Sequence, residues 1–137
     1  MRKNSIEARV NRISPPTDKG NWRHFSITAT REARRAIATR LVRQRAATKP
    51  TTAELKKRRP NCKLEYLTAS ELGQRCRDIL KIRTMNTFHK VDISRWESGK
   101  RMPSLPHLEV LARAYGIRLH ELLGVGMKDK IIVVNVK

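Results

Sequence analysis

The stretch Ile93-Ser-Arg-Trp-Glu-Ser-Gly-Lys-Arg-Met-Pro-Ser-Leu105 joins two short helical patterns through a turn. Gly99 supplies a left-handed stop for the first helix, and Ser104 can cap the second, with Pro106 tolerated in its first turn. The second pattern ends at Gly116, and its apolar stripe consists of Leu105, Leu108, Leu111, Ala112 and Tyr115. The stretch therefore predicts two helices that share a small core.

Three further helices are predicted around this pair. Thr30–Thr48 has one apolar stripe and a capping threonine, and Pro50 ends it. From Leu67 a helical pattern runs to Arg83, with Thr68 or Ser70 as its cap. The helix that contains Ile93 is expected to start near Asn86 or Thr87 and to end at Glu97 or Ser98. A short final helix is expected at Ile117–Leu123.

The segment 49–66 reads as a linker between helices. Pro60 forbids one helix from running through it, but Thr52–Lys57 can form a short helical turn. The basic run Lys56-Lys-Arg-Arg59 is either a phosphate contact or a solvated loop.

Residues Ile93–Gly124 resemble the helix-turn-helix family of Cro and phage-repressor proteins, also called the Xre family. The resemblance is specific over about a quarter of the chain and looser upstream to Leu67. It implies an all-α fold: a compact helix-turn-helix bundle of about five helices, here with a basic N-terminal arm and a short C-terminal β-strand. In the family, the residue at Trp96 is mostly structural and Glu97 helps to hold the following loop.

The upstream spacing departs from the family pattern and admits two alignments. Leu67-Thr-Ala-Ser-Glu-Leu-Gly73 matches the usual opening of the helix before the turn, but Ile93 then lies about ten residues too far away. In this preferred alignment, Thr30–Thr48 is the first helix, the second helix is extended, and the turn is long. Alternatively, Leu72–Leu80 is the first helix, and the second is nearly absent.

The family's DNA-binding mode assigns candidate site residues. A recognition helix presents its first residues to base edges in the major groove. The candidate base-reading residues are Thr87, His89, Lys90, Asp92, Ser94 and Arg95. The candidate phosphate contacts are Lys100, Arg101, Ser104, Arg34, Arg35, Lys56, Lys57 and Arg58. The alternative for each is a polar surface that only faces water.

The charge of the chain favours a polyanionic partner. Lysine and arginine number 31 against 12 acidic residues, a formal net charge of +19. Residues 1–66 contain 18 of the basic and 5 of the acidic side chains. Such an excess favours double-stranded DNA through counterion release, without specifying sequence. We divide the chain into a basic arm (1–29), a basic helix and linker (30–66), a helix-turn-helix domain (67–124) and a tail (125–137).

The tail contains a predicted strand. Residues 131–134 are four consecutive β-branched side chains within the segment 130–137. A lone exposed strand invites aggregation. We therefore expect it either to form a homodimer by pairing with a second subunit, which is the preferred alternative, or to fold back on the domain.

Several classes are disfavoured. Cys62, Cys76 and four scattered histidines lack the close pairs of a zinc site, so we expect no metal and no cofactor. No apolar run approaches the ~20 residues of a membrane span, and there is no signal-peptide core. A cytoplasmic protein of a bacterium or of a phage-infected host is expected. An enzyme is improbable because acidic residues are sparse and no catalytic grouping appears.

These observations predict a sequence-specific transcription regulator, most simply a repressor of phage or mobile-element origin that binds operator DNA. Two alternatives remain open. A nucleoid-type protein would bind DNA or RNA without sequence preference, as the basic front half allows. An antitoxin would combine a helix-turn-helix with a toxin-blocking segment, for which the tail is a candidate.

Overall fold

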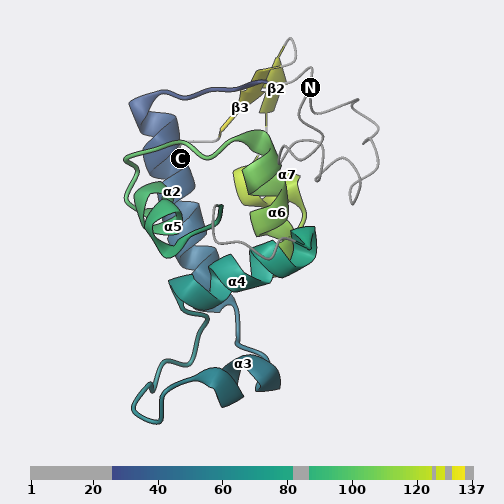
Figure 1. Cartoon of the computed structure of the whole chain (residues 1–137). Helices are drawn as coiled ribbons and strands as arrows, with labels where there is room; N and C mark the ends of the chain where they lie inside the picture. The colour runs from purple at the N-terminus through teal and green to yellow at the C-terminus, as the bar shows by residue number, and fades with distance from the viewer. Residues whose placement is uncertain (1–25, 82–86, 125, 129–130, 135–137) are drawn as a thin grey trace.

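The computed structural model describes residues 26–81, 87–124, 126–128 and 131–134. In these ranges the chain forms six helices and three short strands (Figure 1). The helices are α2 (Arg31–Ala47), α3 (Thr52–Lys57), α4 (Ala69–Leu80), α5 (Lys90–Glu97), α6 (Leu105–Tyr115) and α7 (Leu119–Leu123). The strands are β1 (Ser26–Ile27), β2 (Gly126–Lys128) and β3 (Ile131–Val133). The predicted all-α bundle is confirmed, and most of the predicted arm lies outside the described residues.

Capping residues set most helix boundaries where the sequence placed them. Thr30 caps α2 by accepting a hydrogen bond from the Ala33 amide, and Ser104 caps α6 in the same way. Thr51 and Thr68 form capping boxes at the starts of α3 and α4. Each such cap is worth about 1 kcal/mol. Because these signals are local, α2 and α3 were predicted to within a residue.

The start of α5 was predicted too early, and the helix before it ends at Leu80, not at Arg83. Helix α4 packs against α5, as the preferred alignment expects of the second helix. Helix α5 begins at Lys90 because Phe88 has a left-handed backbone, with φ of 53°, and His89 is extended. Likewise, α7 begins at Leu119, because Arg118 is extended.

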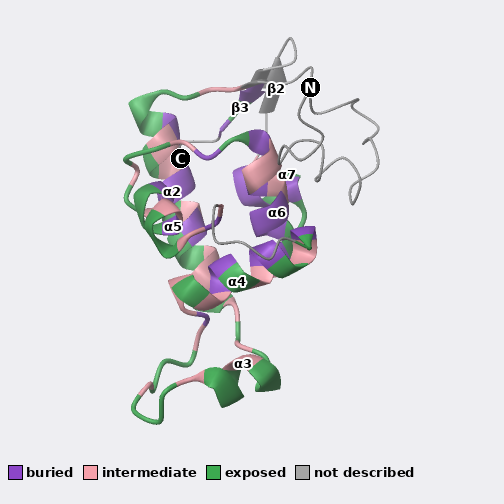
Figure 2. Cartoon of the chain, in the orientation of Figure 1, coloured by how far each residue is buried: buried purple, intermediate pink, exposed green. Residues whose placement is uncertain are grey.

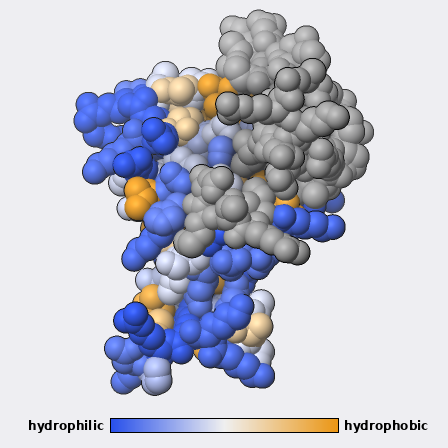
Figure 3. Space-filling model, viewed as in Figure 1, coloured by the Kyte–Doolittle hydropathy of each residue, from blue (hydrophilic) through white to orange (hydrophobic). Residues whose placement is uncertain are grey.

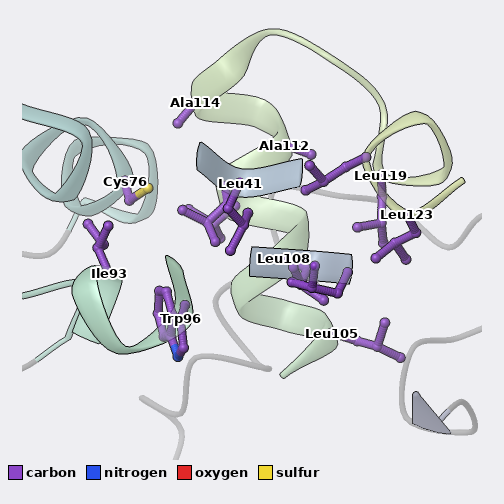
Figure 4. Packing of buried hydrophobic residues seen from close by; sticks show 14 of the residues in the cluster. Leu41, Cys76, Ile93, Trp96, Leu105, Leu108, Ala112, Ala114, Leu119 and Leu123 are labelled. Carbon is purple, nitrogen blue, oxygen red and sulfur yellow. The ribbon is translucent and has the colours of Figure 1, made fainter. Parts of the chain in front are cut away.

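One hydrophobic core joins α2, α4, α5, α6 and α7. Figure 2 shows buried residues along the facing sides of these helices, and Figure 4 shows Leu41, Ile93 and Leu108 pointing into the same interior. The largest fully buried side chains are Phe88, Ile37, Leu41, Leu67, Leu72, Ile93, Leu108, Leu111, Leu122, Leu123 and Val110. Burial of each such side chain stabilises the fold by roughly 1.5–3 kcal/mol. This core fixes the position of α5, which is only eight residues long.

The segment 49–66 leaves the bundle as a separate lobe, hereafter the 49–66 lobe. Figure 1 shows α3 below the bundle, at the end where α2 stops and α4 begins. Helix α3 has no buried residue, and Figure 2 colours it as exposed and intermediate. The lobe is therefore not held by a core of its own.

The C-terminal strand folds back on its own chain. Strand β3 lies between β1 and β2, pairing in parallel with β1 and antiparallel with β2. Ile132 and Val134 are 5% and 3% exposed and belong to the core. Both edges of β3 are thus used within the chain, so the preferred expectation that this strand pairs with a second subunit is not supported. The fold-back alternative describes the structure.

Candidate nucleic-acid interface

Helix α5 presents a short basic face to solvent. Ile93 and Trp96 point into the core, being 1% and 5% exposed. Lys90, Ser94 and Arg95 are exposed on the opposite side. Lys90 and Ser94 are four residues apart and share one face of the helix, and Arg95 follows Ser94 on the exposed side.

Val91 also lies on this exposed face and was missed by the sequence reasoning. It is 47% exposed, although valine is usually buried. Its position one turn before Arg95 was the available signal, because residues i and i+4 share a face. The face therefore combines two cations, a hydroxyl and an aliphatic group.

The other three candidate base-reading residues have structural roles at the start of α5. The His89 Nδ1 atom accepts from the Val91 amide at 3.2 Å, and Asp92 Oδ2 accepts from the His89 amide at 3.1 Å. Thr87 Oγ1 lies 3.5 Å from His107 Nε2. These three side chains are half-buried, and some of their polar atoms already have partners within the protein. The structure thus divides the six candidates into three exposed residues and three half-buried ones, of which His89 and Asp92 cap α5.

A tight contact between α4 and the chain entering α5 fixes where α5 starts. A Cβ added at Gly73 would lie 2.3 Å from the carbonyl oxygen of Phe88, so only glycine allows this approach. The buried Arg77 donates from its NH1 to the same carbonyl at 2.9 Å. Its NH2 donates to Gln74 Oε1 at 3.2 Å. Arg77 and Gly73 thus position α5 from α4.

Neither residue was identified from the sequence. The available signal was Gly73 itself, because a glycine inside a helical pattern often marks a close packing contact. Arg77 gave no signal, since a buried arginine looks like any other charged residue in a helical pattern.

An aromatic cluster supports the buried side of α5. The Phe88, Trp96 and His107 rings lie with centroids 5.0–5.8 Å apart. His107 also lies close to the α6 cap, with Nδ1 2.5 Å from Ser104 Oγ. Burial lowers the pKa of His107 to about 4, against the opposing effect of the Asp92 carboxylate. His107 is therefore neutral at neutral pH, and its ring connects the start of α5 to the start of α6.

The far end of α5 is attached to α2 by an ion pair. Arg45 donates from Nε and NH2 to the two carboxylate oxygens of Glu97, each at 2.8 Å. The hydrogen bond with Glu97 raises the pKa of Arg45. Arg45 also donates to the carbonyl of Leu67 at 3.2 Å. The family's role for Glu97 in holding the loop takes the form here of a contact with α2.

The loop between α5 and α6 presents two cations beside this helix. Lys100 and Arg101 are exposed, and their backbone amides donate to the carbonyl oxygen of Arg95 at 3.0 and 3.3 Å. Gly99 adopts φ of 77°, and a Cβ there would lie 3.8 Å from α2 atoms of Arg35 and Ala38. The loop is therefore held close against α2, with both charged side chains outside.

The remaining candidates on α2 and in the lobe differ in accessibility. Arg35, Lys56 and Lys57 are exposed. Arg35 also lines a shallow groove with Ser98 at the end of α5, so it lies near the basic loop. Arg34 is half-buried, and its NH1 donates to the Ala29 carbonyl at 2.8 Å.

Arg58 does not fit the expectation of a phosphate contact. Its guanidinium donates to both carboxylate oxygens of Glu71 and to the carbonyls of Leu64 and Tyr66. Its side chain is only 7% exposed. The physical reason is that the Nε–NH2 edge of Arg58 binds a carboxylate while NH1 and NH2 donate to backbone carbonyls, which leaves no free edge of the guanidinium for a phosphate.

The described residues contain neither a group of side chains placed to hold a metal ion nor a helix that could span a membrane. No group of three histidine, cysteine or acidic side chains there is placed to hold a metal ion. Cys76 is buried and Cys62 half-buried, both as free thiols. Burial raises the pKa of Cys76. Among the same residues, no helix has the length and apolar character needed to cross a bilayer.

Residues 90–122 match the family model described as Helix-turn-helix, which covers α5, the basic loop, α6 and most of α7. Over these residues, the chain is similar to the helix-turn-helix family of Cro-, phage-repressor- and Xre-type regulators. Comparison with curated proteins and with solved structures found no match.

Proposed function

We propose that this protein is a sequence-specific transcription regulator, most simply a repressor of phage or mobile-element origin that acts on operator DNA. The observation that carries the proposal is the exposed face of α5, formed by Lys90, Val91, Ser94 and Arg95. This face is backed by an aromatic cluster and fixed at both ends by contacts to α4 and α2. A short helix held in this way can enter the major groove without losing its position.

The base-reading assignment follows the chemistry of the face. Arg95 and Lys90 can donate to O6 and N7 of guanine, and Ser94 can donate or accept. Val91 provides an apolar contact for a thymine methyl group. Thr87, His89 and Asp92 lie at the start of α5, and in the proposal their remaining polar atoms add contacts at the same end of the helix. Arg95 is the most discriminating of these residues because a bidentate arginine–guanine contact is worth about 1–3 kcal/mol.

Phosphate contacts flank this face in the proposal. Lys100 and Arg101 bind the backbone on the side of the α5–α6 loop, together with the amide of Ser104 at the start of α6. Arg35 on α2 adds a further phosphate contact beside this loop, and the half-buried Arg34 is the neighbouring candidate. Such contacts position the domain and add salt-dependent affinity, but they do not read sequence.

The test compares the DNA motifs selected by two variants from a random duplex pool. Arg95→Ala should relax the preference at one base pair of the motif and cost about 1–3 kcal/mol on the wild-type motif. Arg118→Ala removes one exposed cation from the residue before α7, outside α5 and the basic loop, and serves as the control. An Arg95→Ala protein that selects the wild-type motif with unchanged preference at every position would refute the assignment.

A non-specific nucleic-acid binder is the second candidate function, and the formal charge of +19 favours it. In that case the basic surface provides the affinity and α5 has no privileged role. As a dimeric operator-binding protein, the chain would instead select a palindrome with half-sites about one helical turn apart. Because both edges of β3 are used within the chain, such a dimer would have to use another surface.

A further inference from the structure

The 49–66 lobe is held to the bundle by two arginine–glutamate pairs. Arg58 in the lobe binds Glu71 on α4, with Nε–Oε2 and NH2–Oε1 distances of 2.8 and 2.7 Å. Glu54 on α3 binds Arg75 on α4, with a Nε–Oε2 distance of 3.1 Å. All four side chains are at most 20% exposed. Together, these two bidentate ion pairs fix the orientation of the lobe relative to α4, even though α3 buries no side chain.

Backbone contacts extend both pairs. Arg58 also donates to the carbonyls of Leu64 and Tyr66, which closes the lobe on itself. Arg75 donates to the carbonyls of Ala114 and Lys49, which connects α6 to the beginning of the lobe. The hydrogen bond with Arg58 lowers the pKa of Glu71 to about 2, so the pair stays ionised at neutral pH. The lobe is thus a fixed extension of α4.

The two ion pairs neutralise the half-buried charges of the lobe, and the charges that remain exposed on it are mostly basic. The exposed cations of the segment are Lys49, Lys56, Lys57, Arg59 and Lys63. Among its acidic residues, Glu54 is paired, which leaves Glu65 as the exposed one. Figure 3 shows a largely hydrophilic lobe surface, interrupted by small apolar patches. Such a surface attracts polyanions, since fixed cations release counterions from phosphates.

The lobe is connected to the end of α5 through one arginine. The lobe leads into α4, which begins at Ala69, and the first helix of a helix-turn-helix crosses the DNA backbone. The Arg45 guanidinium, which binds Glu97 at the end of α5, also lies 5.9 Å from the Tyr66 ring centroid and donates to the Leu67 carbonyl. The base of the lobe and the end of α5 therefore share one contact residue.

We propose that the 49–66 lobe is a second DNA-binding surface that contacts phosphates of duplex DNA flanking the base pairs read by α5. Its contacts are made by Lys56, Lys57 and the neighbouring exposed cations, while Arg58 and Arg75 position it. This inference rests on the proposed function and extends it to DNA outside the motif. If the lobe contacts these phosphates, the protein covers more DNA than the motif alone, and the additional contacts do not depend on sequence.

The test uses the full chain and two duplexes that carry the selected motif, one with flanks of about one helical turn and one trimmed to the motif. Lys56→Gln/Lys57→Gln should retain the selected motif and lose the wild-type preference for the flanked duplex. Its plot of log affinity against log salt should become shallower by about 1–2, because each lost phosphate contact removes about 0.9. Protection of the flanks from backbone cleavage should disappear.

The matched control is Lys81→Gln/Arg118→Gln. It removes the same number of exposed charges from the other end of α4 and from the residue before α7. It should leave the flank preference and the flank protection intact. If both double variants lose the same affinity on both duplexes, the lobe only adds net charge and the inference is wrong.

A third variant tests the positioning arginines. Glu54→Gln/Glu71→Gln breaks both ion pairs, makes the chain more basic by two charges, and keeps both capping boxes, since glutamine serves there too. Flank protection should be lost even though the net charge has risen. Tighter binding to the flanked duplex would overturn the role of the pairs. If the wild-type protein selects no motif at all, the proposed function fails, which differs from a failure of the lobe alone.

Discussion

Gly73 shows how one residue on α4 can decide where the recognition helix lies. Its missing side chain lets the Phe88 carbonyl approach α4, and Arg77 then donates to that carbonyl. Both interactions act on Phe88, the residue before the α5 cap. A substitution of Gly73 or Arg77 should therefore weaken DNA binding, although neither residue belongs to the exposed face of α5.

The substitution Gly73→Ala should destabilise the protein. Alanine favours a helix by about 0.5–1 kcal/mol over glycine, but forcing a Cβ against backbone typically costs about 1–3 kcal/mol. The net loss should appear in urea unfolding, accompanied by weaker binding to the selected DNA. Ser70→Ala, on the exposed side of the same helix, serves as the control. A more stable Gly73→Ala protein would contradict the close contact.

His107 should make stability depend on pH between about 6.5 and 4. Its pKa is lowered in the folded state, so the unfolded chain binds more protons in this window. The free energy of unfolding should therefore fall as the pH drops below 6.5, by up to about 3 kcal/mol at pH 4. Urea unfolding of wild type and His107→Gln at pH 7 and pH 5 measures the difference. An equal pH dependence in both proteins would exclude His107 as its source.

Among the helices and strands, the boundaries set by local caps and turns could be predicted from the sequence, whereas those set by long-range contacts could not. Helices α2 and α3 were predicted closely because their threonine caps and flanking prolines act locally. The start of α5 was missed, since the left-handed Phe88 depends on Gly73 and Arg77, which lie more than ten residues away. The C-terminal strand was predicted, but its partners were not, because β1 lies about a hundred residues earlier in the chain.

Strand β3 provides a direct test of the intrachain sheet. Ile132→Ala should lower the free energy of unfolding by roughly 2–5 kcal/mol, since this side chain is buried in the core. Val133→Ala changes the adjacent residue of the same strand, where the side chain is 43% exposed, and should cost much less. The unfolding midpoint of Ile132→Ala should not depend on protein concentration. If the wild-type midpoint depends on protein concentration and Ile132→Ala abolishes that dependence, β3 pairs between subunits instead.

At the scale of the whole molecule, the charge is divided between internal and external roles. Arg45, Arg58, Arg75 and Arg77 bind carboxylates or carbonyls within the protein. The exposed cations gather on α5, the following loop, α2 and the 49–66 lobe. Composition predicted a polyanionic partner, but it could not separate these two groups. That separation depends on which glutamates the fold brings within reach of each arginine.

If α5 reads sequence, the protein must bind its selected motif far more tightly than unrelated DNA. The affinity for the motif selected from a random duplex pool should be compared with the affinity for a scrambled duplex of equal length, at near-physiological salt. We expect a ratio of roughly 10³ or more, as for other operator-binding proteins. A ratio near one would contradict it and leave a basic protein that binds DNA without regard to sequence.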